Sequence, residues 1–251
     1  MNILKERVRS GDRLFGAWLA LASPATAEVM AYAGFDFLVI DNEHGAGTIR
    51  DAVDIMRASE AAGTPCILRV PYNDPIYLKR ALDAGATSIM VPMVESRQEA
   101  AELAAACRYP PLGRRGFAAT SQRCSRYGID QDYTMRASED LFLIAQIETA
   151  VAVEQTEKIA AVDGIDMILI GVNDLSGSIG LLGELDHPDV QRLVALAEQG
   201  TRTAQKALGT VPTPSRSAQD LFDDGYNLVA GPVDSMLLRE AAVAAIRVVK
   251  G

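Results

Sequence analysis

The chain has 251 residues, of which 49% are hydrophobic and 23% are charged, and its formal net charge is −9. This composition is typical of a soluble enzyme domain, and the length suits one closed α/β barrel. The negative charge argues against binding to nucleic acid or to anionic membranes, because both need a basic surface.

The sequence indicates neither a membrane span nor a disulfide framework. No apolar run approaches the ~20 residues of a membrane-spanning helix, and the amino terminus lacks the apolar core of a signal peptide. The cysteines Cys66, Cys107 and Cys124 are irregularly spaced, without a zinc pattern or a redox Cys-x-x-Cys motif. We therefore expect a cytoplasmic protein in which Cys66 and Cys107 are buried free thiols.

Eight short apolar segments are predicted to be buried strands. They lie near residues 15–21, 36–41, 65–70, 88–94, 141–148, 167–171, 208–212 and 227–232. Their apolar runs lack clean alternation, as expected of parallel strands that are covered on both faces. Helical patterns separate them, at about 25–33, 48–62, 74–84, 96–108, 149–162, 188–207, 217–224 and 234–249.

Four junctions between a helix and the next strand repeat one pattern, in which a glycine closes the helix before a short turn. They are Ala33-Gly34, Ala84-Gly85, Asp163-Gly164 and Asp224-Gly225. Glycine suits the left-handed conformation that often ends a helix. Strand and helix alternating eight times predict an α/β fold, a (β/α)₈ TIM barrel in a single domain over residues 1–251.

One long irregular segment, near residues 109–140, interrupts this alternation between the fourth helix and the fifth strand. It contains Arg114, Arg115, Arg123 and Arg126. A connection of this length in a compact domain is usually functional. We therefore expect it to be an active-site loop insertion over the mouth of the barrel.

Ionisable residues gather where strands meet the helices that follow them. In this class of barrel the chemistry takes place at that end of the strands. The residues are Asp41, Glu43 and His44 after the second strand, Arg69 at the end of the third, Glu148 at the end of the fifth, and Asp174 after the sixth. We expect their side chains to face one common mouth.

Glu148 and Asp174 suggest a site for a divalent cation. Oxygen ligands on rigid strands suit Mg²⁺, Mn²⁺ or Co²⁺. Two protein ligands would leave coordination positions for water and substrate, as metal catalysis requires. The alternative is that both carboxylates cap, or lie in the first turn of, the helices that follow.

The other polar residues also have two interpretations each. Arg69 is either a clamp on a substrate carboxylate or enolate oxygen, for which guanidinium geometry is well matched, or a salt bridge at the rim. His44 is either a base oriented by Asp41 or an ordinary loop residue after a capping aspartate. His187 is expected to have a capping or surface role, and Trp18 is expected in the core.

Several short motifs occur in the order in which one aldolase family carries them. They are Gly34-Phe35-Asp36 with Asp41-Asn42-Glu43-His44, Arg69-Val70-Pro71 with Asn73-Asp74-Pro75, Val91-Pro92-Met93-Val94, the run from Arg108 to Gly116, Gln146-Ile147-Glu148-Thr149, and Gly171-Val172-Asn173-Asp174-Leu175-Ser176. On these motifs the chain resembles the HpcH/HpaI aldolases, class II (metal-dependent) aldolases of the phosphoenolpyruvate/pyruvate superfamily. The resemblance covers nearly the whole chain.

The resemblance implies an activity and an assembly. The family cleaves 4-hydroxy-2-oxo acids to pyruvate and an aldehyde, and it runs the reverse addition through a metal-stabilised pyruvate enolate. Family members form trimers or hexamers in which the last helix packs on a neighbouring subunit. The implied roles are metal ligands at Glu148 and Asp174, a base at His44 oriented by Asp41, pyruvate binding by Arg69 and Gln146, and a carboxylate cradle of backbone amides at Gly171, Val172 and Asn173.

Two further features bear on this resemblance. The family usually has Gly-Pro where this chain has Gly171-Val172; valine restores a backbone N–H and frees φ, which affects the tightness of the pocket and not its metal ligands. No strand end carries a lysine, which argues against a Schiff-base mechanism. Within the long insertion, residues 113–127 are expected to help choose the aldehyde.

Other functions remain open from sequence alone. One alternative is a CoA-ester lyase of the malyl or citramalyl type, and another is an oxaloacetate decarboxylase that uses the same metal enolate. A non-catalytic metabolite-binding barrel is the more remote alternative. The sequence does not identify the natural aldehyde, the physiological metal or the stereoselectivity.

Overall fold

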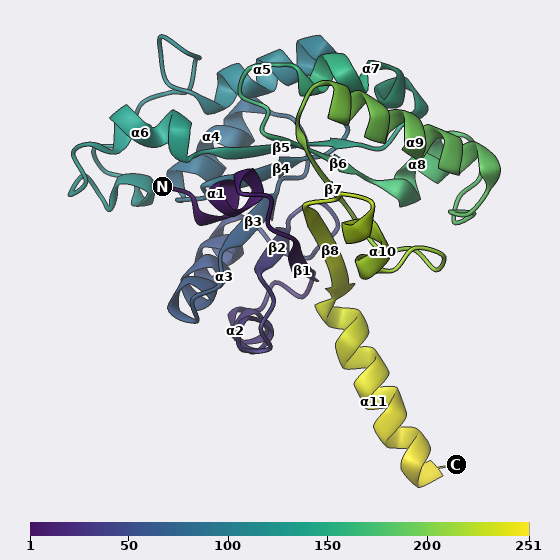
Figure 1. Cartoon of the computed structure of the whole chain (residues 1–251). Helices are drawn as coiled ribbons and strands as arrows, with labels where there is room; N and C mark the ends of the chain where they lie inside the picture. The colour runs from purple at the N-terminus through teal and green to yellow at the C-terminus, as the bar shows by residue number, and fades with distance from the viewer. Residues whose placement is uncertain (251) are drawn as a thin grey trace.

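The computed structural model describes residues 1–250 and contains a closed barrel of eight parallel strands (Figure 1). Each strand pairs with its neighbours in chain order, and β8 pairs with β1 to close the barrel. The predicted (β/α)₈ fold in a single domain is therefore confirmed. The strands are β1 Leu14–Leu19, β2 Phe37–Asp41, β3 Cys66–Arg69, β4 Ser88–Val91, β5 Phe142–Ile147, β6 Met167–Ile170, β7 Ala207–Thr210 and β8 Leu228–Val233.

All eight predicted helices are present. They are α2 Pro24–Tyr32, α3 Ile49–Ala61, α4 Pro75–Asp83, α5 Arg97–Cys107, α7 Ala150–Ala160, α9 Pro188–Thr203, α10 Ala218–Asp223 and α11 Asp234–Lys250. His187 caps α9, because its Nδ1 accepts a hydrogen bond from the backbone N–H of Asp189. Its predicted capping role is confirmed.

Three short helices were not predicted, and the reasons are physical. The helices are α1 Ile3–Arg9, α6 Tyr133–Asp140 and α8 Val172–Ser178, with a 3₁₀ turn at Arg123–Ser125. α6 buries none of its residues and lies within residues 109–140, which were predicted to be irregular. α1 and α8 have seven residues each, which is only two helical turns.

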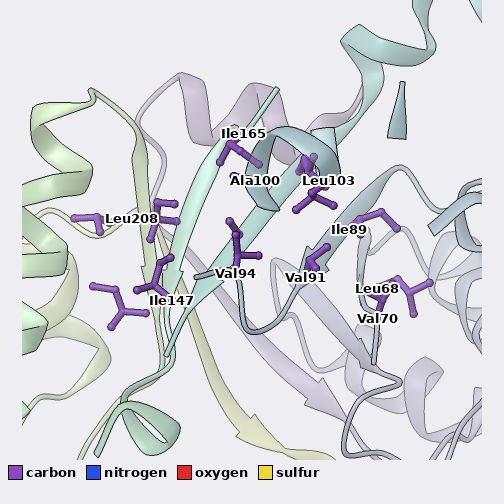
Figure 2. Packing of buried hydrophobic residues seen from close by; sticks show 14 of the residues in the cluster. Leu68, Val70, Ile89, Val91, Val94, Ala100, Leu103, Ile147, Ile165 and Leu208 are labelled. Carbon is purple, nitrogen blue, oxygen red and sulfur yellow. The ribbon is translucent and has the colours of Figure 1, made fainter. Parts of the chain in front are cut away.

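Alternate residues of each strand face the inside and the outside of the barrel. In β2, Phe37 and Val39 belong to a cluster that fills the barrel, whereas Leu38 and Ile40 belong to the layer between strands and helices. Figure 2 shows part of that outer layer, with Leu68 and Val91 from strands β3 and β4 and with Ala100 and Leu103 from α5. Burying a leucine or isoleucine side chain of this kind contributes roughly 1.5–3 kcal/mol, so both layers stabilise the fold.

Cys107 is buried as expected, whereas Cys66, also expected to be buried, is only partly buried. All three are free thiols. Burial raises the pKa of both the Cys66 and the Cys107 thiol to about 12, so neither is a reactive thiolate at neutral pH.

The long segment between α5 and β5 does not lie over the mouth of its own barrel. Arg115 pairs with Asp83 at the end of α4, and Arg123 contacts the carbonyl of Ala84 and the carboxylate of Glu60 near the end of α3. These partners lie at the amino-terminal end of the strands. The expected position is wrong for a topological reason: a helix returns the chain to that end, so a helix-to-strand connection starts and finishes there.

The last helix, α11, projects away from the barrel and ends far from it (Figure 1). Only its first residue, Asp234, is buried, and it accepts hydrogen bonds from the backbone N–H groups of Ala20 and Leu21. Apolar side chains of α11 such as Leu238, Ile246 and Val249 are exposed. Over residues 1–250, no helix is both long and apolar enough to cross a membrane.

Candidate active site

The interior register of the strands carries the polar residues to one end of the barrel. Phe37 and Val39 point inward, so Asp41 continues the same face of β2. The same alternation follows Ile67 with Arg69, and Ile144 with Gln146 and then Glu148. At the carboxyl end of the barrel, polar side chains therefore take the inward-facing positions that apolar side chains occupy lower in the strands.

Arg69 is held by two carboxylates. Its Nε and Nη2 donate to Oδ1 and Oδ2 of Asp41 at 3.0 and 2.7 Å, and its Nη1 lies 3.0 Å from Oε2 of Glu43. Its guanidinium carbon also lies 4.4 Å from the ring centroid of Trp18. The Arg69 side chain is 10% exposed. Arg69 is thus a buried, pre-oriented cation of the barrel interior.

The carboxylate of Asp41 holds the turn that follows β2. Its Oδ1 accepts hydrogen bonds from the backbone N–H groups of Glu43 and His44, both at 3.1 Å. Burial works to raise the pKa of Asp41, but the hydrogen bonds and charge of Arg69, with these two N–H groups, bring it below its usual value. Asp41 is therefore ionised and fixed.

Asp41 accepts a hydrogen bond from the backbone N–H of His44 and does not contact the His44 ring. The carboxylate beside the imidazole is Glu43, whose Oε2 lies 3.8 Å from His44 Nε2. The His44 side chain is 65% exposed and lines the mouth of the cavity. The expectation that Asp41 orients the imidazole is corrected here, because both oxygens of Asp41 are occupied by Arg69.

Glu43 was expected at the mouth of the barrel, but no role was assigned to it from the sequence. It lies between the cation of Arg69 and the ring of His44. Burial raises the pKa of its carboxyl group, and the nearby Asp41 and Asp174 raise it further, whereas Arg69 and His44 lower it. The signal was present in the run Asp41-Asn42-Glu43-His44, but which carboxylate turns toward the histidine depends on the path of the loop.

Glu148 is almost fully buried, with 2% of its surface exposed. Its Oε1 accepts the backbone N–H of Met93 at 2.7 Å, and its Oε2 accepts the side-chain amide of Gln146. Burial raises the pKa of Glu148 to about 7; those two hydrogen bonds oppose the shift, and the charges of Glu43 and Asp174 add to it. Thr149, and not Glu148, caps α7, so the capping alternative does not apply to Glu148.

A tight backbone turn brings the end of β6 against Glu148. A Cβ on Gly171 would lie 2.8 Å from Glu148 Oε2 and 3.2 Å from Gln146 Nε2, so only glycine fits without displacing them. The short helix α8 starts directly after it, with Val172 buried and Asn173 and Asp174 exposed in its first turn. Backbone N–H groups in a first helical turn have no partner within the helix and are free to bind a ligand.

These residues surround one cavity of about 430 Å³ at the carboxyl end of the barrel. Its polar lining includes Asp41, His44, Arg69, Gln146, Gly171 and Asp174. A larger hollow of about 590 Å³ lies at the opposite end, beside the segment 109–140, and contains none of these residues. Four of the six ionisable residues expected at the strand ends, Asp41, His44, Arg69 and Asp174, therefore line this cavity, whereas Glu43 and Glu148 are not among its lining residues.

The residues present fit a divalent cation. No cluster of three or more His, Cys, Asp or Glu side chains with metal-binding geometry occurs in residues 1–250. Two carboxylates, Glu148 and Asp174, are near enough for the charge of Asp174 to raise the pKa of Glu148. The buried Oε1 of Gln146 also has no hydrogen-bond partner. A buried carboxylate beside two others is costly without a counter-charge, and oxygen donors of this kind suit Mg²⁺ or Mn²⁺.

The comparisons with known proteins agree with this geometry. The sequence model of the HpcH/HpaI aldolase/citrate lyase family matches residues 14–241. The chain belongs to this family.

Two curated relatives have names that give an activity. A 2-dehydro-3,6-dideoxy-6-sulfogluconate aldolase of Pseudomonas putida is 39% identical, over 94% of this chain and 92% of its own. A hydroxypyruvate/pyruvate aldolase of Roseobacter denitrificans is 38% identical, over 95% and 93% of the two chains. The named relatives are thus aldolases, which are carbon–carbon lyases.

Solved structures share the fold. An HpcH/HpaI aldolase/citrate lyase family protein from Burkholderia cenocepacia superimposes with a TM-score of 0.94 over the full length of both chains, at 36% identity. The citrate lyase β subunit of M. tuberculosis, solved with oxaloacetate and magnesium, has a TM-score of 0.57 over 92% of this chain and 94% of its own. Its identity is only 18%, so it shares the fold alone.

Proposed function

We propose that this protein is a metal-dependent pyruvate aldolase. It cleaves 4-hydroxy-2-oxo acids to pyruvate and an aldehyde, and it catalyses the reverse addition. The observation that carries this proposal is the shared cavity of Asp41, His44, Arg69, Gln146 and Asp174, with Glu148 buried beside it. The family and the names of its relatives support the same reaction class.

Cleavage needs one base and one site of positive charge. His44 takes the proton of the substrate's 4-hydroxyl group at its imidazole, since it is the exposed base at the mouth of the cavity. The C3–C4 bond then breaks, the aldehyde leaves, and the electron pair moves onto the pyruvate fragment as an enolate. The proton that His44 has taken is then returned to C3, which completes pyruvate and restores the neutral imidazole.

Arg69, fixed by Asp41 and Glu43, supplies a cation at the oxygen where the enolate charge develops. A divalent cation held by Glu148 and Asp174 would supply further Lewis-acid stabilisation there. Gln146 orients pyruvate, and the backbone N–H groups of Val172 and Asn173, after the turn at Gly171, receive its carboxylate.

The activity is tested by the release of pyruvate. Purified protein with Mn²⁺ is given a 4-hydroxy-2-oxo acid, oxaloacetate and a citramalyl thioester of coenzyme A in separate reactions, since each of them releases pyruvate when it is cleaved or decarboxylated. We expect pyruvate from the first at the highest kcat/KM, with slower decarboxylation of oxaloacetate. Preferred cleavage of the thioester would favour the CoA-ester lyase, and no turnover of any of the three would leave a non-catalytic barrel.

We also propose that the protein acts as a homo-oligomer, a trimer or a hexamer, in which α11 packs on a second copy. The support is the row of exposed apolar side chains on a helix that leaves its own barrel, among them Leu238, Ile246 and Val249. A surface of this kind is uncommon on a monomer. Sedimentation equilibrium tests this: a monomer at micromolar concentration would refute it.

A further inference from the structure

We propose that Met93 is a positioning residue for the candidate metal site, because the left-handed conformation of its backbone directs its N–H group onto Glu148 and fixes that carboxylate for a divalent cation. This inference rests on the metal-dependent function proposed above. It concerns a residue that acts through its backbone, since the side chain of Met93 is not among those that line the cavity.

The backbone of Met93 has an uncommon conformation for a residue with a side chain. Its φ angle is +53°, in the left-handed region that favours glycine. Among residues 1–250, the residues other than glycine with a positive φ are Ala22, Met93, Arg126, Tyr127 and Gln205. Met93 is the one of these whose backbone N–H donates to a carboxylate. Strained backbone of this kind is concentrated at functional sites.

Contacts on both sides hold Met93 in this conformation. Pro92 precedes it, and the proline ring fixes its own φ. Val94 follows it and is buried, and its N–H donates to a backbone carbonyl of β5 at 3.3 Å. Glu95 then accepts a hydrogen bond from the hydroxyl of Thr149 at 2.7 Å. The loop after β4 is therefore held against the end of β5 and the start of α7, so Met93 cannot relax without loss of these contacts.

The N–H of Met93 completes the hydrogen bonding of a buried carboxylate. Oε1 of Glu148 accepts this N–H at 2.7 Å, and Oε2 accepts the side-chain amide of Gln146. With one donor on each oxygen, the plane of the carboxylate is fixed. A carboxylate has about four lone-pair sites, so each oxygen keeps one for a cation. Glu148 is thus oriented before a metal binds, and the cost of ordering it on binding is reduced.

The side chain of Met93 does not explain why the residue adopts this conformation. It is 49% exposed, so a substitution removes little packing. A set of substitutions at this position therefore reports on the backbone. Glycine and asparagine adopt the left-handed conformation readily, whereas β-branched residues rarely do. The φ preference of the new residue, and not its size or polarity, should decide the affinity for metal.

The first experiment measures the Kd for Mn²⁺ by titration calorimetry of metal-free protein. Met93→Val and Met93→Thr should bind Mn²⁺ at least about tenfold more weakly than the unaltered protein, a difference of about 1.4 kcal/mol. Met93→Gly and Met93→Asn should stay within about threefold, although both lose the thioether.

An unchanged Kd in folded Met93→Val or Met93→Thr would overturn the inference. Tenfold weaker binding by Met93→Gly or Met93→Asn would overturn it too, because the side chain and not the backbone would then matter. These two variants decide the question alone if the β-branched variants do not fold.

Gln205→Val is the matched control. Gln205 also has a left-handed backbone, with a φ of +56°, but it precedes β7 at the other end of the barrel. The substitution should lower Tm much as Met93→Val does and leave the Kd for Mn²⁺ unchanged. If the Kd rose equally in both variants, loss of stability and not the orientation of Glu148 would be the cause, and the inference would be wrong.

A measurement on metal-free protein separates this inference from the proposed function. If the unaltered protein binds no Mn²⁺, the metal-dependent proposal fails, and amide hydrogen exchange then decides whether Met93 holds Glu148. The N–H of Met93 should be protected although the residue is exposed, and Glu148→Ala should speed its exchange at least about tenfold. Rapid exchange of this N–H in the unaltered protein would contradict the positioning role whatever the metal result.

Discussion

Glu43 lies between the two basic side chains of the site, 3.0 Å from Arg69 Nη1 and 3.8 Å from His44 Nε2. Residue types alone predicted that Asp41, His44 and Arg69 would meet at one mouth. They did not predict which carboxylate would face the imidazole, because that depends on how the loop after β2 turns. Asp41 is engaged by Arg69 and by two backbone N–H groups, which leaves Glu43 beside His44.

His44→Ala should lower aldol cleavage by roughly 10²–10⁴-fold, the usual loss when a positioned base is removed. The affinity for Mn²⁺ should be nearly unchanged, because Glu148 and Asp174 remain. Decarboxylation of oxaloacetate should fall less, since it requires no proton to leave a hydroxyl group. Steady-state kinetics with both substrates, and titration with Mn²⁺, measure these effects.

His187→Ala is the control for that variant, since His187 is the chain's other histidine and caps α9. It should change neither reaction. Equal losses of cleavage and decarboxylation in His44→Ala would mean that His44 shapes the site without moving the proton.

Glycine is required at position 171 because of the space beside Glu148 and not because of its φ angle. A methyl group there would meet Glu148 Oε2 at 2.8 Å. Gly171→Ala should therefore displace the carboxylate and weaken Mn²⁺ binding by at least about tenfold, or 1.4 kcal/mol. In Gly177→Ala, within α8, the added methyl group would meet only the flexible end of Leu182 at 3.2 Å. An affinity for Mn²⁺ that is the same in both variants would argue against this packing.

At the scale of elements, the strands and the long helices were predictable because burial imposes apolar runs on them. The position of the segment 109–140 was not predicted correctly, because its arginines suggested a binding role and its topology was overlooked. Arg115 has a structural role in this chain: it pairs with Asp83 at 2.8 Å, and its guanidinium carbon lies 4.5 Å from the Tyr109 ring centroid.

Arg115→Ala should lower the free energy of unfolding by roughly 3–5 kcal/mol, because it leaves Asp83 unpaired in a largely buried position. The neighbouring Arg114 is exposed, and Arg114→Ala should change stability by less than about 0.5 kcal/mol. Urea unfolding curves measure both values. The aldehyde preference of Arg115→Ala should match that of the unaltered protein. A stable Arg115→Ala variant with altered preference would restore a substrate role for this segment.

At the scale of the whole molecule, the barrel brings residues from β2, β3, β5 and β6 into one cavity although more than a hundred positions separate Asp41 from Glu148 and Asp174. Sequence alone predicted this convergence because every strand of a parallel barrel ends at the same face. It could not predict which residues after β7 and β8 line the cavity, since that depends on which loop residues turn inward there.

The central claim is that cleavage depends on a divalent cation held by Glu148 and Asp174. The most direct measurement is the rate of pyruvate release from a 4-hydroxy-2-oxo acid after exhaustive chelation, and again after titration with Mn²⁺. We expect the chelated protein to be inactive, Mn²⁺ to restore the rate at about one equivalent per chain, and Glu148→Gln to show no recovery. Full activity of the metal-free protein would contradict the account.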